Sequence, residues 1–279
     1  MPYRTLIEPL ALLAAMARQE RLVLLDCGFD LGDTAAGERA YQAGHLPAAQ
    51  YAHLDRDLSG VKTGRNGRHP LPERAAFAAR AGAWGVAPGV QVVAYDGQGG
   101  PYAARAWWLL RWLGHDAVAV LDGGLAAFVA AGGHAERESA PATAEPPYPA
   151  QAPAMPCIDA ASLLAQLDTT TVLDARPAER FRGDVEPLDA VAGHIPGAHN
   201  RFFKDNLLPD GRFKPAQVLR HEFAAYAATL PTLVHSCGSG VTACHNLLAM
   251  EHAGLAGTRL YAGSWSEWCS DPARPVARG

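Results

Sequence analysis

A cysteine opens a glycine-rich turn in the segment His235-Ser236-Cys237-Gly238-Ser239-Gly240-Val241-Thr242. Apolar residues 232–234 predict a short buried strand before the turn, and the helical spacing of apolar residues in 243–254 predicts a helix after it. The two glycines allow successive backbone N–H groups to curl around one sulfur atom, and the helix N-terminus adds partial positive charge. Such a setting favours the thiolate, the reactive form of cysteine. We therefore predict that Cys237 is a nucleophile rather than a buried structural cysteine, the role that we prefer for Cys244.

Length and composition limit the possible classes of protein. The chain has 279 residues, of which 49% are hydrophobic, enough for two ordinary cores or one large core. The net charge of −4, with dispersed charged residues, predicts no nucleic-acid partner. The apolar stretch from Leu6 to Met16 is interrupted by Glu8 and Pro9, so we predict an amphipathic helix there rather than a signal peptide or a membrane span.

The spacing of the cysteines indicates the cellular compartment, and the motifs for metal and phosphate binding indicate which cofactors to expect. Five widely spaced cysteines without paired zinc spacing predict reduced thiols and a cytoplasmic location. The sequence shows neither a metal-ligand cluster nor a phosphate-binding fingerprint, and we predict catalysis without a metal or an organic cofactor.

The two halves of the chain repeat one pattern. Each half contains, in order, a strand that ends in Asp, a Gly-His-Leu/Ile-Pro segment, a strand that leads into a turn, and a final strand that ends near Gly; these begin at Leu24, Gly44, Val92 and Val120, and again at Val172, Gly193, Leu233 and Leu260. Strands alternate with helical stretches such as 103–113 and 243–252, the pattern of a parallel sheet covered by helices. The sequence therefore predicts an α/β protein of two tandem copies of one domain.

The expected boundaries place the first domain at 1–134, a linker at 135–156 and the second domain at 157–279. The linker contains six prolines and is expected to run extended over the surface. By alignment the first domain carries Asp96 where the second carries Cys237. We expect the amides of its own loop to hold this carboxylate, and the first domain to be non-catalytic.

These features resemble the two-domain rhodanese-type sulfurtransferases over nearly the whole chain. The resemblance rests on the tandem domains, both Gly-His-Leu/Ile-Pro segments, the loop CGSGVTA and the C-terminal GSWSEW, and the loop is most similar to that of the 3-mercaptopyruvate sulfurtransferases. It implies that Cys237 takes sulfur from a donor, holds it as a persulfide, and passes it to cyanide or a thiol acceptor such as thioredoxin. A ring of amides would stabilise the persulfide anion.

The expected donor is 3-mercaptopyruvate, and thiosulfate is the alternative. Family members that use thiosulfate place basic residues after the cysteine, whereas Gly238, Ser239, Gly240, Val241 and Thr242 carry no charge. We predict that Gly238, Gly240, Val241 and Thr242 bind the substrate. The resemblance assigns the donor carboxylate to Arg180, whose guanidinium can donate two hydrogen bonds; a surface or interdomain salt bridge is the other interpretation. Some relatives carry a second arginine before the Gly-His-Ile-Pro segment, but residues 184–189 contain none, and Arg182 is a weak substitute.

The resemblance also implies a catalytic set of Ser239 with His69 and Asp55 from the first domain. A serine that is oriented by imidazole and carboxylate could polarise the carbonyl group of the donor. Without the resemblance, a lone histidine in a loop is more often structural. We interpret His45 and His194, in the repeated turn segments, as structural hydrogen-bonding residues.

Two other classes of protein can be compared with the loop. A cysteine phosphatase needs an arginine six positions after the nucleophile, and Ala243 occupies that position. A non-catalytic binding module of the same fold is consistent with Asp96 in the first half, but Cys237 argues against it in the second.

Overall fold

The computed structural model describes residues 2–138 and 142–279 and divides into two compact units. We call Met1–Ser59, Pro72–Ala154 and Pro209–Phe213 the N-terminal unit, and Gly60–Leu71, Met155–Leu208 and Lys214–Gly279 the C-terminal unit. Two short segments therefore belong to the unit that is built mainly from the other half of the sequence. Among the described residues, no helix is long and apolar enough to cross a membrane.

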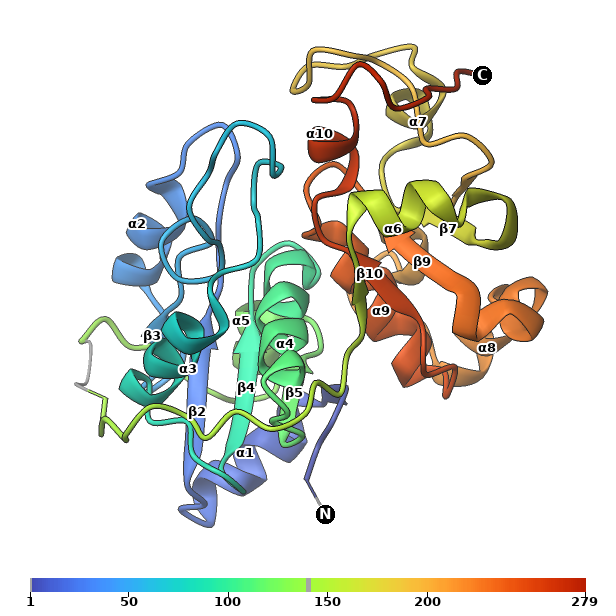
Figure 1. The fold of residues 1–279 in the computed structure, drawn as a ribbon. Helices are drawn as coiled ribbons and strands as arrows, with labels where there is room; N and C mark the ends of the chain where they lie inside the picture. The colour runs from blue at the N-terminus through green and yellow to red at the C-terminus, as the bar shows by residue number, and fades with distance from the viewer. Residues whose placement is uncertain (1, 139–141) are drawn as a thin grey trace. The chain divides into compact units, whose positions relative to one another are not determined.

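The N-terminal unit is built on a parallel sheet of five strands in the order β1-β5-β4-β2-β3. The strands are β1 (Leu6–Ile7), β2 (Leu22–Asp26), β3 (Gln50–Tyr51), β4 (Gln91–Tyr95) and β5 (Val118–Leu121). The helices are α1 (Pro9–Ala17), α2 (Ala36–Ala43), α3 (Arg74–Ala83), α4 (Pro101–Trp112) and α5 (Gly124–Ala130). Helix α4 packs on β4 and β5, α1 packs on α5, and the sheet is flanked by helices (Figure 1).

The C-terminal unit repeats this topology, with the strand order β6-β10-β9-β7-β8. The strands are β6 (Cys157–Ile158), β7 (Thr171–Asp174), β8 (His199–Asn200), β9 (Leu233–Ser236) and β10 (Arg259–Tyr261). The α-helices are α6 (Ala160–Ala165), α7 (Ala178–Arg182), α8 (Ala216–Glu222), α9 (Thr242–His252) and α10 (Ser264–Trp268). Three 3-10 helices, η1 (Leu167–Thr169), η2 (Phe203–Asn206) and η3 (Ala224–Thr232), complete the unit.

The central strands are apolar because helices cover the sheets. In the N-terminal unit, Leu24, Val93 and Leu121 join Leu12 of α1 and Phe128 of α5 in one buried cluster. In the C-terminal unit, the corresponding cluster combines strand residues with helix residues, namely Ile158, Val172, Val234, Tyr261, Leu163, Trp265 and Trp268. The predicted fold, two copies of a parallel α/β domain, is therefore confirmed.

The first predicted helix begins later than expected. Leu6 and Ile7 pair with Val120 and Leu121 as strand β1, and α1 starts only at Pro9. Proline lacks an N–H and is well suited to the first turn of a helix but not to its interior, so the helix begins at Pro9. The residues before it form a strand because of their long-range pairing with β5.

The repeated histidines have the structural roles that we predicted. His45 Nδ1 lies 2.7 Å from the carbonyl oxygen of Tyr41, and its ring stacks on the tyrosine ring with 3.9 Å between centroids. His194 Nδ1 lies 2.8 Å from the Phe181 carbonyl oxygen, and its ring stacks on Phe181 at the same distance. Each histidine thus fixes the same turn in its own unit.

Most of the proline-rich segment belongs to the N-terminal unit. Residues 139–141 lie outside the described residues, and residues 142–156 contain no helix. The segment is held by backbone bonds from Glu145 to Gly82, from Tyr148 to Ala78 and from Gln151 to Leu113. It is extended along that unit, as its prolines predict.

In the N-terminal unit, Asp96 occupies the position that Cys237 has in the C-terminal unit. The Asp96 carboxylate accepts hydrogen bonds of 2.8–3.0 Å from the backbone N–H groups of Gln98, Gly100, Tyr102 and Ala103. Burial raises the pKa of this carboxyl group, and the four N–H bonds oppose that shift. The expected cradle of amides around Asp96 is confirmed.

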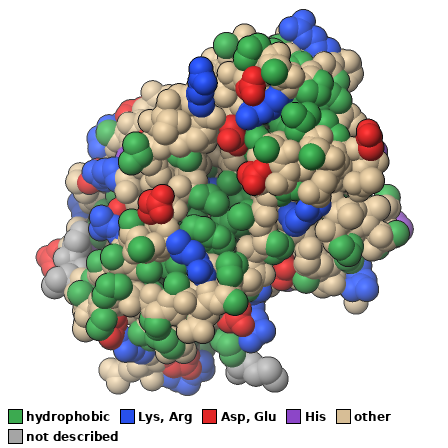
Figure 2. Space-filling view, in the orientation of Figure 1, with side chains coloured by type: hydrophobic (Ala, Val, Ile, Leu, Met, Phe, Trp, Pro, Cys, Tyr) green, Lys and Arg blue, Asp and Glu red, His purple; other side chains and the backbone are tan. Residues whose placement is uncertain are grey.

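Positive and negative side chains are mixed over the face of the molecule that Figure 2 shows. On the face in Figure 2, Lys and Arg alternate with Asp and Glu, and neither sign covers a large area. This distribution is typical of a solvated surface rather than of a polyanion-binding site.

Candidate active site

Cys237 lies at the junction of strand β9 and helix α9. The strand ends at Ser236 and the helix begins at Thr242, so the cysteine is the first residue of a five-residue turn that leads to the helix N-terminus. The side chain is 1% exposed, and Gly240 donates its backbone N–H to the sulfur over 3.1 Å. A backbone N–H directed at sulfur stabilises negative charge there. The geometry suits the thiolate that the sequence predicts.

Gly240 can occupy its position only because it has no side chain. Its φ is +78°, and a Cβ atom there would lie 2.1 Å from the carbonyl oxygen of Ala262. The left-handed backbone and this close approach together determine where the N–H that bonds to Cys237 points.

Replacing Gly240 by alanine should therefore reduce both stability and activity. The left-handed conformation costs alanine ~1 kcal/mol, and the contact with Ala262 also forces the backbone to move. We expect sulfur-transfer activity to fall by at least ~10-fold, the loss that accompanies one charge-assisted hydrogen bond. Chemical denaturation and initial rates measure the two effects.

Gly257→Ala is the matched control. Gly257 has a similar φ of +93°, but a Cβ atom there would meet nothing within 4 Å. This variant should lose only the stability that the left-handed conformation costs alanine, and it should keep its activity. Equal behaviour of the two variants would contradict the role given to Gly240.

The loop is anchored from α10 by backbone and hydroxyl bonds. Cys237 donates its N–H to Ser264 Oγ over 3.0 Å, and the N–H groups of Trp265 and Ser266 donate to the carbonyls of Cys237 and Gly238. The Ser264 hydroxyl lies 2.9 Å from the Tyr261 carbonyl oxygen and 3.9 Å from Cys237 Sγ, so we assign its proton to the carbonyl. Ser264 therefore positions the nucleophile. Sequence analysis assigned it no role, although it lies in the GSWSEW segment.

Two other residues of the turn lead into the helix. Val241 is buried, and its carbonyl accepts the N–H of Cys244; Thr242 is the first residue of α9 and is partly exposed. The first N–H groups of a helix carry partial positive charge. Substrate binding by Val241 and Thr242 remains a prediction. Cys244 donates its thiol to the Gly240 carbonyl at 3.3 Å, as a packing residue would.

Ser239 and His69 form a buried hydrogen-bonded pair. Ser239 Oγ lies 2.7 Å from His69 Nδ1, and the two residues are 7% and 4% exposed. The histidine reaches Ser239 because the segment Gly60–Leu71 belongs to the C-terminal unit. Asp55 lies in the N-terminal unit, where its N–H donates to His53 Nδ1 at 3.1 Å. The participation of Asp55 in the set remains a prediction.

Arg180 lies on α7 and takes part in ion pairs. Its Nη2 lies 2.7 and 2.9 Å from the two carboxylate oxygens of Glu186 and 3.4 Å from Asp189. Burial raises the pKa of Glu186, but hydrogen bonds from Arg180 and two backbone N–H groups outweigh it and lower the pKa below its usual value. These ion pairs are partly buried and lie within the C-terminal unit, so they differ from the surface or interdomain salt bridge of the alternative interpretation. Binding of the donor carboxylate by Arg180 remains a prediction. The Nε atom is buried and has no hydrogen-bond partner among the described residues.

The acidic segment before the Gly-His-Ile-Pro turn orients arginines. Glu186 pairs with Arg176 as well as Arg180, and Asp189 pairs with Arg180 and Arg68. Arg182 instead pairs with Asp184, and both side chains are about half exposed. Arg182 is therefore a surface ion-pair residue, and the structure does not support it as a substitute for a second arginine.

Arg68, like Ser264, is a residue of this site that the sequence did not predict. A Cβ atom on Gly238 would lie 2.9 Å from Arg68 Nη2 and 3.5 Å from Arg180 Nη1. The loop itself carries no cation, as predicted, but two guanidinium groups reach the residue beside Cys237. Of these two arginines, only Arg180 was predicted at the site, because the approach of Arg68 depends on the packing of a distant segment against the turn. The one available signal was the position of Arg68 directly before His69.

His235 is the histidine nearest to Cys237 in sequence, but it is not suited to proton transfer. It is fully buried on β9, and neither ring nitrogen has a hydrogen-bond partner among the described residues. Burial lowers its pKa to about 3, so the ring is neutral at pH 7. Its role is to fill the core.

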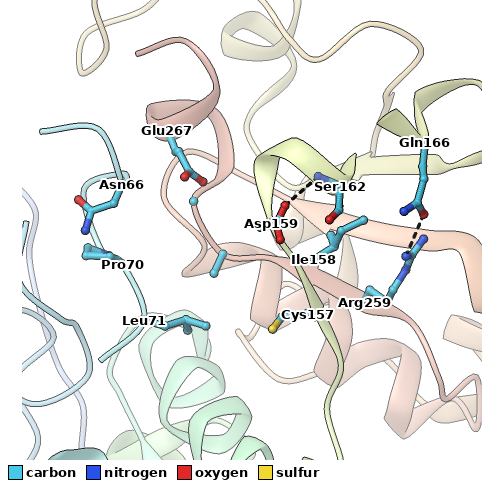
Figure 3. A pocket seen from close by; sticks show the side chains of 12 residues that line it. Asn66, Pro70, Leu71, Cys157, Ile158, Asp159, Ser162, Gln166, Arg259 and Glu267 are labelled. Atoms are coloured by element: carbon cyan, nitrogen blue, oxygen red, sulfur yellow. Dashed lines mark hydrogen bonds between the residues drawn. The ribbon is translucent and has the colours of Figure 1, made fainter. Parts of the chain in front are cut away.

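A cavity of about 510 Å³ lies beside the loop that carries His69. Asn66, Pro70 and Leu71 line it from that loop, and Cys157 and Glu267 line it from β6 and α10 (Figure 3). Cys237 is not among its lining residues. The cavity is therefore a neighbour of the site and does not contain the nucleophile.

The domain repeat and the cysteine loop agree with the match to known families. The rhodanese-like domain matches residues 10–131 and again residues 159–271. The chain therefore belongs to the rhodanese family and contains two copies of its domain.

The full-length relatives carry the names of sulfurtransferases. A Pseudomonas aeruginosa protein named "Probable 3-mercaptopyruvate sulfurtransferase" is 52% identical over 276 residues, which cover 96% of each chain. The thiosulfate sulfurtransferase of Gallus gallus is 34% identical over 261 residues, 88% of this chain and 86% of its own. The structure of 3-mercaptopyruvate sulfurtransferase from Leishmania major has a TM-score of 0.82 and 32% identity, with 95% of this chain and 74% of that chain covered. The chain shares this enzymatic class and is a sulfurtransferase.

Proposed function

We propose that the enzyme moves a sulfane sulfur from 3-mercaptopyruvate, through a persulfide on Cys237, to a thiol or to cyanide. The observation that carries the proposal is the arrangement in one turn of a sulfur bonded by the Gly240 N–H and a hydroxyl, Ser239, paired with His69. The 52% identity to the Pseudomonas aeruginosa relative supports the same donor.

In the first step, the Cys237 thiolate attacks the sulfur of the donor. An S–S bond forms, the C–S bond of mercaptopyruvate breaks, and its electron pair passes to the carbon as the enolate of pyruvate. One proton taken up by that carbon gives pyruvate, and Cys237 is left as the persulfide Cys–S–SH. The backbone N–H of Gly240 stabilises charge at the inner sulfur.

Ser239 and His69 act on the keto group of the donor. As the C–S bond breaks, negative charge develops on the keto oxygen, and the Ser239 hydroxyl donates a hydrogen bond to it. His69 Nδ1, 2.7 Å from Ser239 Oγ, donates to the serine oxygen in turn and strengthens that hydrogen bond. Arg180 holds the carboxylate of the donor. Asp55 is proposed to orient His69.

In the second step, an acceptor takes the outer sulfur. A thiolate attacks it, forms the acceptor persulfide and releases the Cys237 thiolate; cyanide gives thiocyanate in the same way. Thioredoxin is the proposed protein acceptor. All five cysteines are free thiols, which supports a reducing compartment, and we propose the cytoplasm.

Thiosulfate is the second candidate donor. The Gallus gallus relative carries the name of a thiosulfate sulfurtransferase, and the guanidinium groups of Arg68 and Arg180 near Gly238 could attract a dianion. Mercaptopyruvate is favoured because the site offers a buried hydroxyl, Ser239, paired with the imidazole of His69. These groups suit a keto oxygen, and thiosulfate has no keto group.

The donor assignment predicts a higher kcat/KM with 3-mercaptopyruvate than with thiosulfate. Initial rates with both donors, measured side by side with cyanide as acceptor, give the ratio. The ionic strength is held constant because exposed charges are screened by salt. A protein that prefers thiosulfate would contradict the proposed donor.

A further inference from the structure

Arg68 lies on a loop that is fixed to the C-terminal unit. The loop Gly60–Leu71 is closed by a bond from the Gly60 N–H to the Pro70 carbonyl, and Asn66 bridges Thr63 and Val61 inside it. Figure 3 shows three of its residues, Asn66, Pro70 and Leu71, along one side of the cavity. The backbone is therefore held firmly on both sides of Arg68.

Close packing on α10 fixes the register of the loop. Gly67 has a φ of +83°, and a Cβ atom there would lie 2.8 Å from the Gly263 carbonyl oxygen. The next residue, Arg68, donates its backbone N–H to Ser266 Oγ at 3.0 Å. Ser266 also donates its N–H to the Gly238 carbonyl. The backbone of Arg68 and the turn that carries the nucleophile are therefore anchored on the same residue.

The guanidinium group of Arg68 is held at one end and directed toward the turn at the other. Nη1 donates to the Asp189 carboxylate, whereas Nη2 is the atom nearest to the place of a Gly238 side chain, at 2.9 Å. Asp189 also pairs with Arg180, whose Nη1 approaches the same place at 3.5 Å. One carboxylate thus orients two cations toward the residue after Cys237.

The guanidinium groups of Arg68 and Arg180 are exposed enough to bind an anion. The Arg68 and Arg180 side chains are 26% and 15% exposed, whereas the side chain of Asp189 is 6% exposed. The ion-pair chain alternates three arginines with three carboxylates, in the order Asp174, Arg176, Glu186, Arg180, Asp189 and Arg68. The acidic members lie deeper, and two basic members lie at the accessible end.

We propose that Arg68, together with Arg180, binds the carboxylate of the sulfur donor beside Cys237 and so selects an α-keto-acid thiol. This inference rests on the proposed function. Two planar guanidinium groups suit a carboxylate better than one, because each can donate to a different oxygen. The segment 184–189, which contains no arginine, contributes Glu186 and Asp189 to orient these two.

The test compares two donors that differ only in the carboxylate. Mercaptoacetone has the same thiol and the same ketone as 3-mercaptopyruvate, with a methyl group in place of the carboxylate. Arg68→Gln should lower kcat/KM for mercaptopyruvate at least ~10-fold, mainly through KM, as expected for a hydrogen bond to a charged group. The value for mercaptoacetone should stay within about 2-fold, because that donor has no charge for Arg68 to bind.

Two further variants make the comparison specific. Arg65→Gln is the matched control, because Arg65 lies on the same loop and is exposed. It should leave kcat/KM unchanged with both donors. Arg68→Lys keeps the positive charge and the pairing with Asp189, so its mercaptopyruvate value should fall between wild type and Arg68→Gln. It also serves as the test if Arg68→Gln does not fold.

The inference is wrong if the KM for mercaptopyruvate is the same in wild type and both Arg68 variants. It is also wrong if kcat/KM falls by the same factor with mercaptopyruvate and with mercaptoacetone. A wild-type protein that uses thiosulfate but not mercaptopyruvate would instead contradict the proposed function. In that case the inhibition constant of pyruvate, measured against thiosulfate, tests Arg68 independently. It should rise about 10-fold in Arg68→Gln, the change expected for one charge-assisted contact, and an unchanged constant would overturn the inference.

Discussion

Cys237→Ser abolishes sulfur transfer from every donor. A serine hydroxyl stays protonated at neutral pH and cannot form a persulfide, so the proposed intermediate has no carrier. Serine is close in size to cysteine, and its oxygen can still accept the Gly240 N–H, so the turn should remain folded. Assays with mercaptopyruvate and thiosulfate, together with a thermal unfolding curve, measure the effect.

The other cysteines provide matched controls for the same substitution. Cys27 is buried in the N-terminal unit, Cys157 is exposed, and Cys269 is intermediate. Cys27→Ser, Cys157→Ser and Cys269→Ser should each keep most of the activity. Substantial turnover in Cys237→Ser, or an equal loss in Cys157→Ser, would show that the sulfur travels by another route.

Ser239→Ala should lower kcat/KM for 3-mercaptopyruvate by ~100-fold, the loss typical of one hydrogen-bond donor to a developing oxyanion. Thiosulfate has no keto group, so its turnover should change much less. His69→Asn should produce a loss of the same kind. The double variant should lose little more than Ser239→Ala alone, because the two residues act as one unit.

Ser236→Ala is the control for this serine. Ser236 ends strand β9, and its buried hydroxyl has no hydrogen-bond partner among the described residues. Its removal should therefore leave kcat/KM unchanged with both donors. Equal losses with mercaptopyruvate and thiosulfate in Ser239→Ala would mean that Ser239 supports the loop rather than the keto group.

The fold could be predicted because the sequence repeats a local pattern. The apolar strands and the Gly-His-Leu/Ile-Pro segments recur in the same order, and each copy folds into the same strand order. Asp96 could also be placed, because a carboxylate after a buried strand must be satisfied by the amides of its own loop. The start of α1 was predicted less well because β1 pairing with β5 is a long-range contact.

The candidate site was only partly predictable, for a physical reason. The cysteine turn is local, so Cys237, Gly238 and Gly240 could be read from residue types and spacing. Arg68 and Ser264 depend on how distant segments pack against that turn, and no spacing in the sequence encodes this. A salt bridge of Arg180 was foreseen as an alternative, but its partners were not, because Glu186 and Asp189 come close to Arg180 only when the segment after α7 is folded.

The most direct test of the central claim is the mass of the protein after it reacts with 3-mercaptopyruvate. The account predicts an added mass of one sulfur atom on the peptide that contains Cys237, its disappearance on treatment with cyanide, and its absence in Cys237→Ser. Added sulfur on a peptide that contains another cysteine, or turnover without sulfur on Cys237, would contradict the account.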